Sequence, residues 1–363
     1  MRACLAVCAV VAGLALVGCT SSGTRSGHGA QAARRALGHR VLFSTDFALG
    51  LVNGRFDGAG PAPIDDAYAV ALGLANRERL DVRGIVVTYG NDHQAPELRA
   101  ARRAVGAIGA HVPVVGGATE PLANPPIAWF DGTEIRDWCV NDGVRFMARE
   151  LREHGRLTVF AIGPLTDIAC LIRNFPREAR RIERVVALLG SRRGGGLKLG
   201  ATPVPDLNFT LDPVALEILL KQSRIPATFM LFEVTSTVNI TAAQLAPLAG
   251  AGRAGAYYAA ASAPNVQAFD GFQPFDAHTV QWVINPRAYR CFDAGWRVVA
   301  RQPSASPRSG NVDAFRRDLP GRRVRACDAF ASDAQRGAFA DGVVGSVDRA
   351  AAAWARRATP PLP

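Results

Sequence analysis

The chain alternates short β-rich runs with segments of helical length. The runs, rich in Val, Ile, Leu and Phe, lie at residues 41–45, 82–88, 112–115, 157–161, 184–189 and 227–232. Expected helices lie at residues 65–76, 96–109, 141–154, 165–174 and 213–221, and a closing amphipathic helix at 331–357. Such alternation is typical of a parallel sheet covered by helices. The sequence therefore predicts an α/β fold with a mainly parallel central sheet flanked by helices.

Carboxylates recur where strands end and helices begin. Asp46 follows the first run, Asp65 and Asp66 open the first helix, and Asp276 begins another helix far downstream. Asp46 could be a loop-forming or helix-capping residue, and Asp65 and Asp66 could stabilise a helix dipole. However, ligands of parallel sheets bind beyond the carboxyl ends of the strands, where these acids would meet. Gathered carboxylates repel one another unless a cation neutralises them, and oxygen ligands suit Ca²⁺ or Mg²⁺. The pattern predicts a metal-dependent enzyme.

Three polar turns follow other strands of the predicted sheet. Asn91 and Asp92 are expected at the same sheet edge as Asp46, although an Asx turn would explain them equally well. A Gly-Pro bend at residues 163–164 exposes backbone carbonyls that could bind a cation. Asn208 could bind sugar hydroxyls, and we expect Asp212 to cap the helix that begins at the next residue, a proline.

In this order, the motifs resemble those of the inosine-uridine-preferring nucleoside hydrolase family, over roughly residues 41–286. The matching residues are Asp46, Asp65-Asp66, Gly90-Asn91, Gly163-Pro164-Leu165-Thr166-Asp167, Asp206-Leu207-Asn208, Asp212-Pro213 and Asp276.

The resemblance implies Ca²⁺-dependent hydrolysis of the N-glycosidic bond of ribonucleosides to ribose and free base, by a homo-oligomer. It implies that Asp46 is the general base. The implied Ca²⁺ ligands are Asp46, Asp65, Asp66, Asp276 and the backbone carbonyl of Ile162. The implied substrate contacts are Asn91, Asp92, Asp206, Asn208 and Phe275.

The residue before the last Asp favours purine nucleosides. Many family members carry His there, whereas purine-preferring members carry an aromatic residue together with an Asp after the strand-end residue, as Phe275 and Asp92 provide. A stacked aromatic ring can raise the basicity of a purine, and Asp92 could bond its N7 edge. Trp129 and Trp138 could form the other side of a sandwich or belong to the core.

Several positions depart from the family pattern. An insertion at residues 47–64 contains Asp57, which could compete as a ligand. Ser44 and Gly200 replace an Asp and an Asn, and Asp206 is shorter than the expected Glu. These changes would suit a 5′-modified nucleoside or a larger ribosyl compound. They also leave two alternatives: a periplasmic nucleoside- or ribose-binding lipoprotein with an inactive site, and a structural envelope lipoprotein.

The N-terminus reads as a lipoprotein signal. An apolar run at residues 3–17 is shorter than a membrane-spanning helix, and residues 16–19, Leu-Val-Gly-Cys, resemble a bacterial lipobox. We expect a signal peptide at 1–18, a lipidated Cys19, a flexible tether at 19–39 and a hydrolase-like domain at 40–363. Thr20 favours periplasmic retention at the outer membrane. An ordinary secretory signal or an anchoring helix is the alternative.

Composition adds two constraints. The net charge of +11 is carried almost wholly by Arg, but basic runs such as residues 322–325 lack interleaved aromatics, so we expect no nucleic-acid partner. The four cysteines beyond Cys19 could form zero, one or two disulfides in an oxidising periplasm. These are Cys139, Cys170, Cys291 and Cys327.

Overall fold

The computed structural model describes residues 38–52, 60–122, 139–192, 197–199, 202–204, 206–299 and 312–358. The chain divides into two units, Met1–Ala36 and Leu37–Pro363, and every described residue lies in the second. Within this described portion, no helix is long and apolar enough to cross a membrane. The predictions that lie outside the described residues concern the signal peptide, Cys19, the tether up to residue 37, Asp57, Trp129, Trp138 and Gly200.

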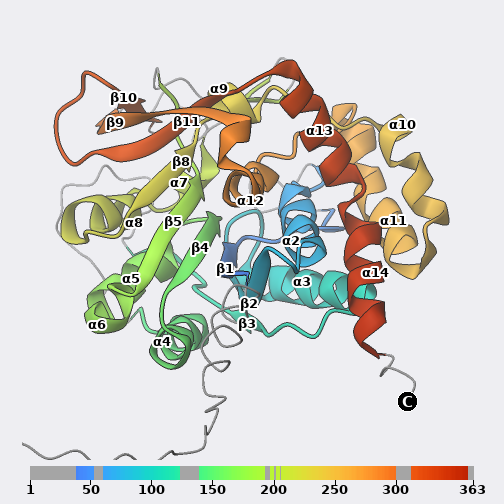
Figure 1. Ribbon diagram of the computed structural model, residues 1–363, viewed down its shortest axis with the longest axis horizontal. Coiled ribbons are helices and arrows are strands. Elements are labelled where there is room, and N and C mark those ends of the chain that lie inside the picture. Colours follow the sequence, from blue (N-terminus) through green and yellow to red (C-terminus); the bar gives the residue numbers. More distant parts are fainter. Residues whose placement is uncertain are drawn as a thin grey trace, which may run out of the picture. The chain divides into compact units, whose positions relative to one another are not determined.

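The described part of the chain forms a nine-stranded sheet and a separate two-stranded one (Figure 1). The strands are β1 His39–Thr45, β2 Leu80–Val87, β3 Val114–Gly116, β4 Leu157–Ile162, β5 Ile182–Leu188, β6 Leu197–Leu199, β7 Thr202–Val204, β8 Ala227–Met230, β9 Tyr289–Val299, β10 Val312–Arg316 and β11 Val324–Phe330.

Helical segments connect most of these strands. They are α2 Asp65–Ala75, α3 Gln94–Ile108, α4 Asp142–His154, α5 Thr166–Asn174, α6 Pro176–Ala179, α7 Leu207–Thr210, α8 Pro213–Glu217, the π-helical η1 Ile218–Gln222, α9 Phe232–Thr235, α10 Ala242–Leu245, η2 Ala246–Gly250, α11 Gly252–Phe269, α12 Ala277–Ile284, η3 Pro286–Ala288, α13 Asp333–Val344 and α14 Ser346–Ala358.

The nine-stranded sheet has the order β10-β9-β11-β8-β5-β4-β1-β2-β3. Its pairings from β3 across to β11 are all parallel. Strand β9 pairs antiparallel with both β11 and β10. The mainly parallel α/β fold predicted from the sequence is therefore confirmed, with an antiparallel edge added to it.

Side chains along β1 alternate between two hydrophobic cores, one on each face of the sheet. Val41 and Phe43 pack with residues of α2, α3, α11, α12 and α14. Leu42 packs with residues of α4, α5 and α8. Figure 1 shows these two groups of helices on opposite sides of the central strands. Because successive side chains of a strand point to opposite faces and both faces are covered, the middle of β1, Val41 to Phe43, is apolar at every position.

The single closing helix expected at residues 331–357 is wrong, because two helices meet at Gly345. The amide of Gly345 donates to Asp341 O at 3.0 Å, which closes the end of α13. The hydroxyl of Ser346 donates to Val343 O at 2.6 Å, where α14 begins. Glycine has a low helix propensity, and of the glycines at residues 337, 342 and 345 the last ends the helix. The helix expected at 213–221 likewise changes from α8 to η1 after Glu217.

Two disulfides settle the alternatives that the sequence leaves open. Cys139 and Cys170 join the segment before α4 to α5. Cys291 and Cys327 lie directly opposite each other on β9 and β11 and are also bonded. The second bond therefore links the antiparallel edge to the parallel part of the sheet.

Candidate active site

Asp46 directly follows β1 and is held in place by a neighbouring turn. Its carboxylate Oδ2 accepts a hydrogen bond from Asn91 N at 3.1 Å, and its carbonyl accepts one from Asn91 Nδ2 at 2.9 Å. Two glycines leave room for it. A Cβ atom would lie 2.1 Å from Asp46 Oδ2 if added at Gly90 and 2.8 Å from Asp46 N if added at Gly163. Both glycines belong to motifs recognised in the sequence.

Three further carboxylates meet beside this strand end. Asp65 and Asp66 are the first two residues of α2, and Asp276 is the N-cap residue of α12. All three are buried, and each offers an oxygen that lies within 4.8 Å of the others. Asp276 forms no side-chain capping bond, and its Oδ1 has no hydrogen-bond partner among the described residues. These carboxylates therefore face one another instead of capping their helices.

Asn91 joins Asp46 to the three-carboxylate group. Its Nδ2 lies 3.4 Å from Asp66 Oδ2 as well as bonding the Asp46 carbonyl. The hydroxyl of Thr45 donates to the other oxygen of Asp66. Thr45 was not among the predicted site residues. The sequence feature that could have identified it is a hydroxyl side chain at the last strand position, next to Asp46. The acidic cluster, defined here as Asp46, Asp65, Asp66 and Asp276, thus forms one connected group.

The acidic cluster is electrostatically strained without a counter-charge. Burial raises the pKa of Asp46 to about 8, and the charge of Asp65 adds to the rise. Burial raises the pKa of Asp65 to about 6, although hydrogen bonds, including one with Asp276, oppose the rise. Burial and the neighbouring carboxylates also raise the pKa values of Asp66 and Asp276 well above the usual range. No basic side chain of the described residues pairs with these groups.

A divalent cation fits these residues. The donors are oxygens only, as Ca²⁺ and Mg²⁺ prefer, and the buried, unpartnered Oδ1 of Asp276 is available to one. Ile162, the predicted carbonyl ligand, ends β4 and pairs in register with Thr45. Its position therefore lies beside the strand end that carries Asp46.

Residues near the two ends of the insertion between Asp46 and Asp65 contact each other. The amide of Ala62 donates to Leu51 O at 2.9 Å, and Asn265 Nδ2 donates to Ala62 O at 2.9 Å. Its first residues, Phe47 and Leu49, are buried in the core. The described ends of the insertion are thus joined by a hydrogen bond before residue 65, and the acidic cluster forms despite the long spacing in sequence.

The predicted substrate contacts from the second half of the chain surround the end of β5. Asn208 Nδ2 donates to Leu188 O at 3.1 Å, and Phe275 packs with Leu188 and Phe232. Phe275 is 8% exposed, so it is largely covered by protein. Asp206 Oδ2 accepts from the amide of Gly190 at 2.7 Å, and its Oδ1 caps α7. The substrate roles of Asp206, Asn208 and Phe275 stay predictions.

Asp92 and His93, the two residues after Asn91, differ in burial and in hydrogen bonding. Asp92 is half-buried, and its Oδ1 accepts from His93 N at 2.6 Å. His93 is exposed. His278, near Asp276, is fully buried, with Nδ1 3.1 Å from Tyr289 Oη, and burial lowers its pKa to about 3. Neither histidine is placed as a proton donor to the acidic cluster.

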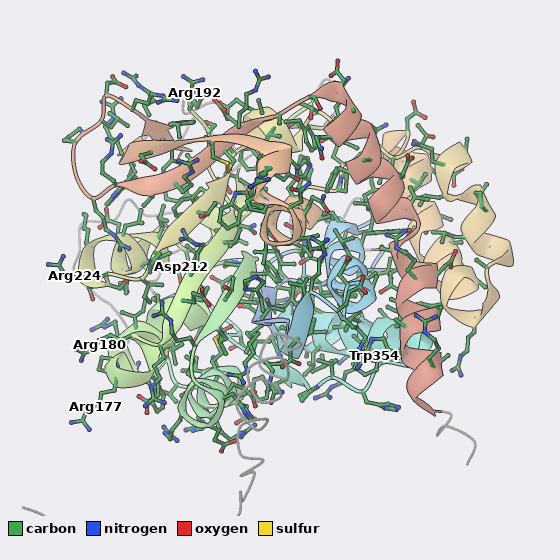
Figure 2. All side chains as sticks on the ribbon, viewed as in Figure 1. Arg177, Arg180, Arg192, Asp212, Arg224 and Trp354 are labelled. Atoms are coloured by element: carbon green, nitrogen blue, oxygen red, sulfur yellow. A yellow bond between two sulfur atoms is a disulfide. The ribbon has the colours of Figure 1, made fainter. Side chains whose placement is uncertain are left out.

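Asp212 is the helix cap that the sequence predicts. Its Oδ1 accepts from Ala215 N at 3.1 Å, at the start of α8. Its Oδ2 accepts from Thr166 Oγ1 at 2.7 Å and from Leu122 N at 3.0 Å. Figure 2 places Asp212 among the strands and helices, whereas Arg177, Arg180 and Arg224 point outward. The role of Asp212 is therefore to fix the local fold.

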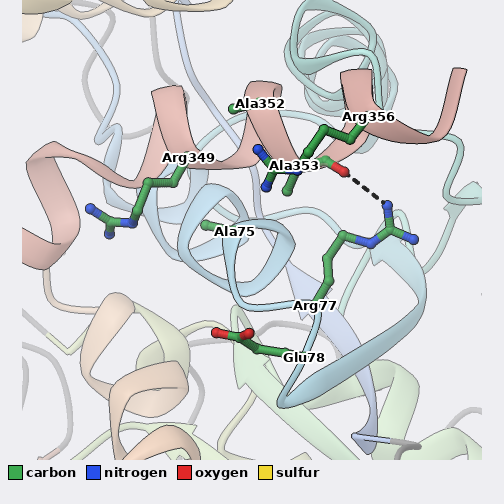
Figure 3. Close-up of a pocket in the computed structure, with 7 residues that line it drawn as sticks. All are labelled: Ala75, Arg77, Glu78, Arg349, Ala352, Ala353 and Arg356. Atoms are coloured by element: carbon green, nitrogen blue, oxygen red, sulfur yellow. Dashed lines mark hydrogen bonds between the residues drawn. The ribbon is translucent and has the colours of Figure 1, made fainter. Parts of the chain in front are cut away.

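A hollow of about 570 Å³ lies between the end of α2 and α14 (Figure 3). Its charged lining residues are Arg77, Glu78, Arg349 and Arg356. Helix α2 begins at Asp65, in the acidic cluster, and ends at Ala75, in the lining of the hollow. The hollow is thus at the opposite end of α2 and does not belong to the candidate site.

One protein-family model matches much of the chain. The family model described as "Inosine-uridine preferring nucleoside hydrolase" matches residues 57–337, more than half of the chain. The match begins after Asp46. A curated relative, the pyrimidine-specific ribonucleoside hydrolase RihA of Citrobacter koseri, is 34% identical over 195 residues, which are 49% of this chain and 60% of that protein. The chain thus spans about 60% of the length of this relative.

Solved structures share the fold. A plant nucleoside hydrolase, PpNRh1, superposes with a TM-score of 0.65 at 19% identity, covering 85% of this chain and 99% of that one. A purine-preferring ribonucleoside hydrolase from Gardnerella vaginalis gives a TM-score of 0.64 at 18% identity, with coverages of 85% and 99%. At such identities the likeness concerns the fold alone.

Proposed function

This chain belongs to the inosine-uridine preferring nucleoside hydrolase family, and from that membership we propose that it hydrolyses the N-glycosidic bond of ribonucleosides to ribose and free base. The observation that carries the proposal is the buried acidic cluster, whose charges require a cation. Asp65, Asp66 and Asp276 offer oxygens within 4.8 Å of one another. Such a site suits activation of water better than simple sugar capture.

We propose Ca²⁺ as the cation, held by the acidic cluster and the carbonyl of Ile162. When bound, it lowers the pKa of a water molecule and offsets the repulsion among the carboxylates. Asp46, fixed by Asn91, takes the proton from the water that attacks C1′ of the ribose. The nearby carboxylates stabilise the positive charge that develops on the sugar as the glycosidic bond breaks. The departing base takes up a proton from solvent, and Asp46 then returns its own proton to solvent.

Purine nucleosides are the proposed substrates. Phe275 packs beside Leu188 and Phe232 and is 8% exposed, and we propose that a purine stacks against it there. Asp92 would bond the N7 edge of the base, while Asn91, Asp206 and Asn208 would contact the sugar. The name of the Citrobacter relative favours a second candidate, a pyrimidine nucleosidase.

Steady-state kinetics with inosine, guanosine, adenosine, uridine and cytidine distinguish the two candidates. We expect higher kcat/KM for the purines, and a loss of that preference in Phe275→Ala. Phe269→Ala, an exposed aromatic outside the site, should change nothing. Higher kcat/KM for uridine and cytidine would replace the purine proposal with the pyrimidine one and leave the hydrolase proposal intact.

The proposed location is the periplasmic side of the bacterial outer membrane, through a lipid on Cys19, with the chain acting as a homo-oligomer. The lipobox-like residues 16–19 support the anchor. Metabolic labelling with a fatty acid should label the wild type and not Cys19→Ala. Label-free wild-type protein in the cytoplasmic fraction would exclude the anchor, and light scattering of purified protein would give the number of subunits.

A further inference from the structure

A fifth buried carboxyl group lies beside the acidic cluster and takes no part in the proposed chemistry. Glu97, near the start of α3, is 0% exposed. Its Oε1 accepts a hydrogen bond from the backbone amide of Asp92 at 2.6 Å. Its Oε2 has no hydrogen-bond partner among the described residues. The contact that Glu97 makes is thus directed at the turn that carries Asn91.

That turn is tied to Asp46 on its other side. The amide of Gly90 donates to Asp92 O at 3.1 Å, which closes the turn on itself. Asn91 then donates to Asp46 through both its amide and its side chain. Gly90 lies against Asp46, since an added Cβ atom would be 2.1 Å from Asp46 Oδ2. Glu97 and Asp46 therefore hold the same turn from opposite ends.

The chemistry of a buried carboxyl group suits this position. Burial raises the pKa of Glu97 well above its usual value, and the charges of Asp46 and Asp66 raise it further. Burial and these charges thus oppose the ionisation of Glu97. An uncharged Glu97 accepts the Asp92 hydrogen bond without adding another negative charge beside the acidic cluster.

We propose that Glu97 is a positioning residue for the hydrolase: its bond to the Asp92 amide sets the turn through which Asn91 aligns Asp46 with the attacking water. Glu97 itself contacts neither substrate nor cation. The inference rests on the proposed function and adds to it a residue on α3, outside the matched motifs.

Three variants of the full chain test this role. Glu97→Met keeps the volume of the side chain and removes the acceptor, so kcat for inosine should fall about 10-fold, as expected for a misplaced catalytic group. Glu97→Gln keeps an oxygen at Oε1 and should retain kcat within about 3-fold of the wild type. Glu150→Met removes another buried carboxylate, on α4, which bonds Arg83. It should leave kcat unchanged.

Hydrogen exchange of the Asp92 amide supplies a readout that does not depend on turnover. Protection should fall in Glu97→Met and survive in Glu97→Gln. Wild-type kcat and protection in a folded Glu97→Met would overturn the positioning role, as would a Glu97→Gln as impaired as Glu97→Met. A wild-type chain without turnover would refute the proposed function instead, and the exchange measurement would still report whether Glu97 holds the turn.

Discussion

Asp46 is fixed before any substrate arrives, because Asn91 holds both its carboxylate and its carbonyl. A general base in this position contributes most of its effect to the chemical step. We therefore expect Asp46→Ala to lower kcat by about 10²- to 10⁴-fold while nucleoside binding survives. Ribose release and equilibrium binding of inosine measure the two separately. Asp318→Ala, which changes an exposed carboxylate, is the control, and undiminished turnover in Asp46→Ala would exclude Asp46 as the base.

Glycine is required at position 90 because a side chain would not fit beside Asp46, and not because the backbone must be flexible. A methyl group there would collide with Asp46, so Gly90→Ala should destabilise the protein by about 1–3 kcal/mol and reduce kcat. Gly106, in α3, has nothing within 4 Å of an added Cβ. Gly106→Ala should therefore stabilise the helix by about 0.5–1 kcal/mol. Thermal unfolding and kcat of the two variants make the comparison, and equal effects would contradict the contact.

Among the elements, the antiparallel edge depends on a covalent link to the rest of the sheet. The disulfide between Cys291 and Cys327 joins β9 to β11, and β11 pairs parallel with β8. Replacing both cysteines by alanine should lower the free energy of unfolding by about 2–4 kcal/mol. Denaturant unfolding measures this loss. An unchanged midpoint would show that hydrogen bonding and packing alone secure the edge.

The parallel core could be predicted because its strands contain apolar runs bounded by polar residues, as in Val41 to Phe43 before Ser44. The antiparallel strands escaped prediction because they alternate apolar residues with Arg and Asp, as in β11, and half-exposed strands give a weaker signal. The sequence predicted one closing helix because its amphipathic pattern continues past Gly345. In the structure the helical hydrogen bonding does not continue past that residue, so two helices form. Here a glycine changes where the helices begin and end, and the segment remains helical on both sides.

The acidic cluster could be predicted because each member stands at a strand-to-helix junction. Its supporting contacts could not. Thr45 and Glu97 act through hydrogen bonds to Asp66 and to the Asp92 amide, which join elements distant in sequence or lie within a turn of unknown shape. One carboxylate oxygen of Asp206 accepts a hydrogen bond from Gly190 N, and this bond also affects whether Asp206 can contact substrate. Such contacts cannot be read from the order of residues along the chain.

For the whole molecule, the acidic cluster predicts how stability depends on pH. The raised pKa values of Asp46 and Asp65 mean that the folded protein binds protons more tightly than the unfolded chain. The resulting stability is fully present below about pH 4 and is lost as pH rises through about 6 to 8. With chelator, the Tm should therefore fall from about pH 5 to about pH 8.

Added Ca²⁺ should reverse this loss, because the ion binds deprotonated carboxylates of the folded state. The rise in Tm on adding Ca²⁺ should be larger at about pH 8 than at about pH 5. Equal rises at both values, or a chelated protein whose Tm is independent of pH, would contradict a cation site built from the acidic cluster.

Release of reducing sugar from inosine and the other four nucleosides, with Ca²⁺ and with chelator, tests the central claim most directly. The account predicts Ca²⁺-dependent ribose release by the wild type and almost none by Asp46→Ala. Failure to release ribose from any of the five nucleosides, with Ca²⁺ still bound, would contradict hydrolysis of these substrates and favour a binding lipoprotein.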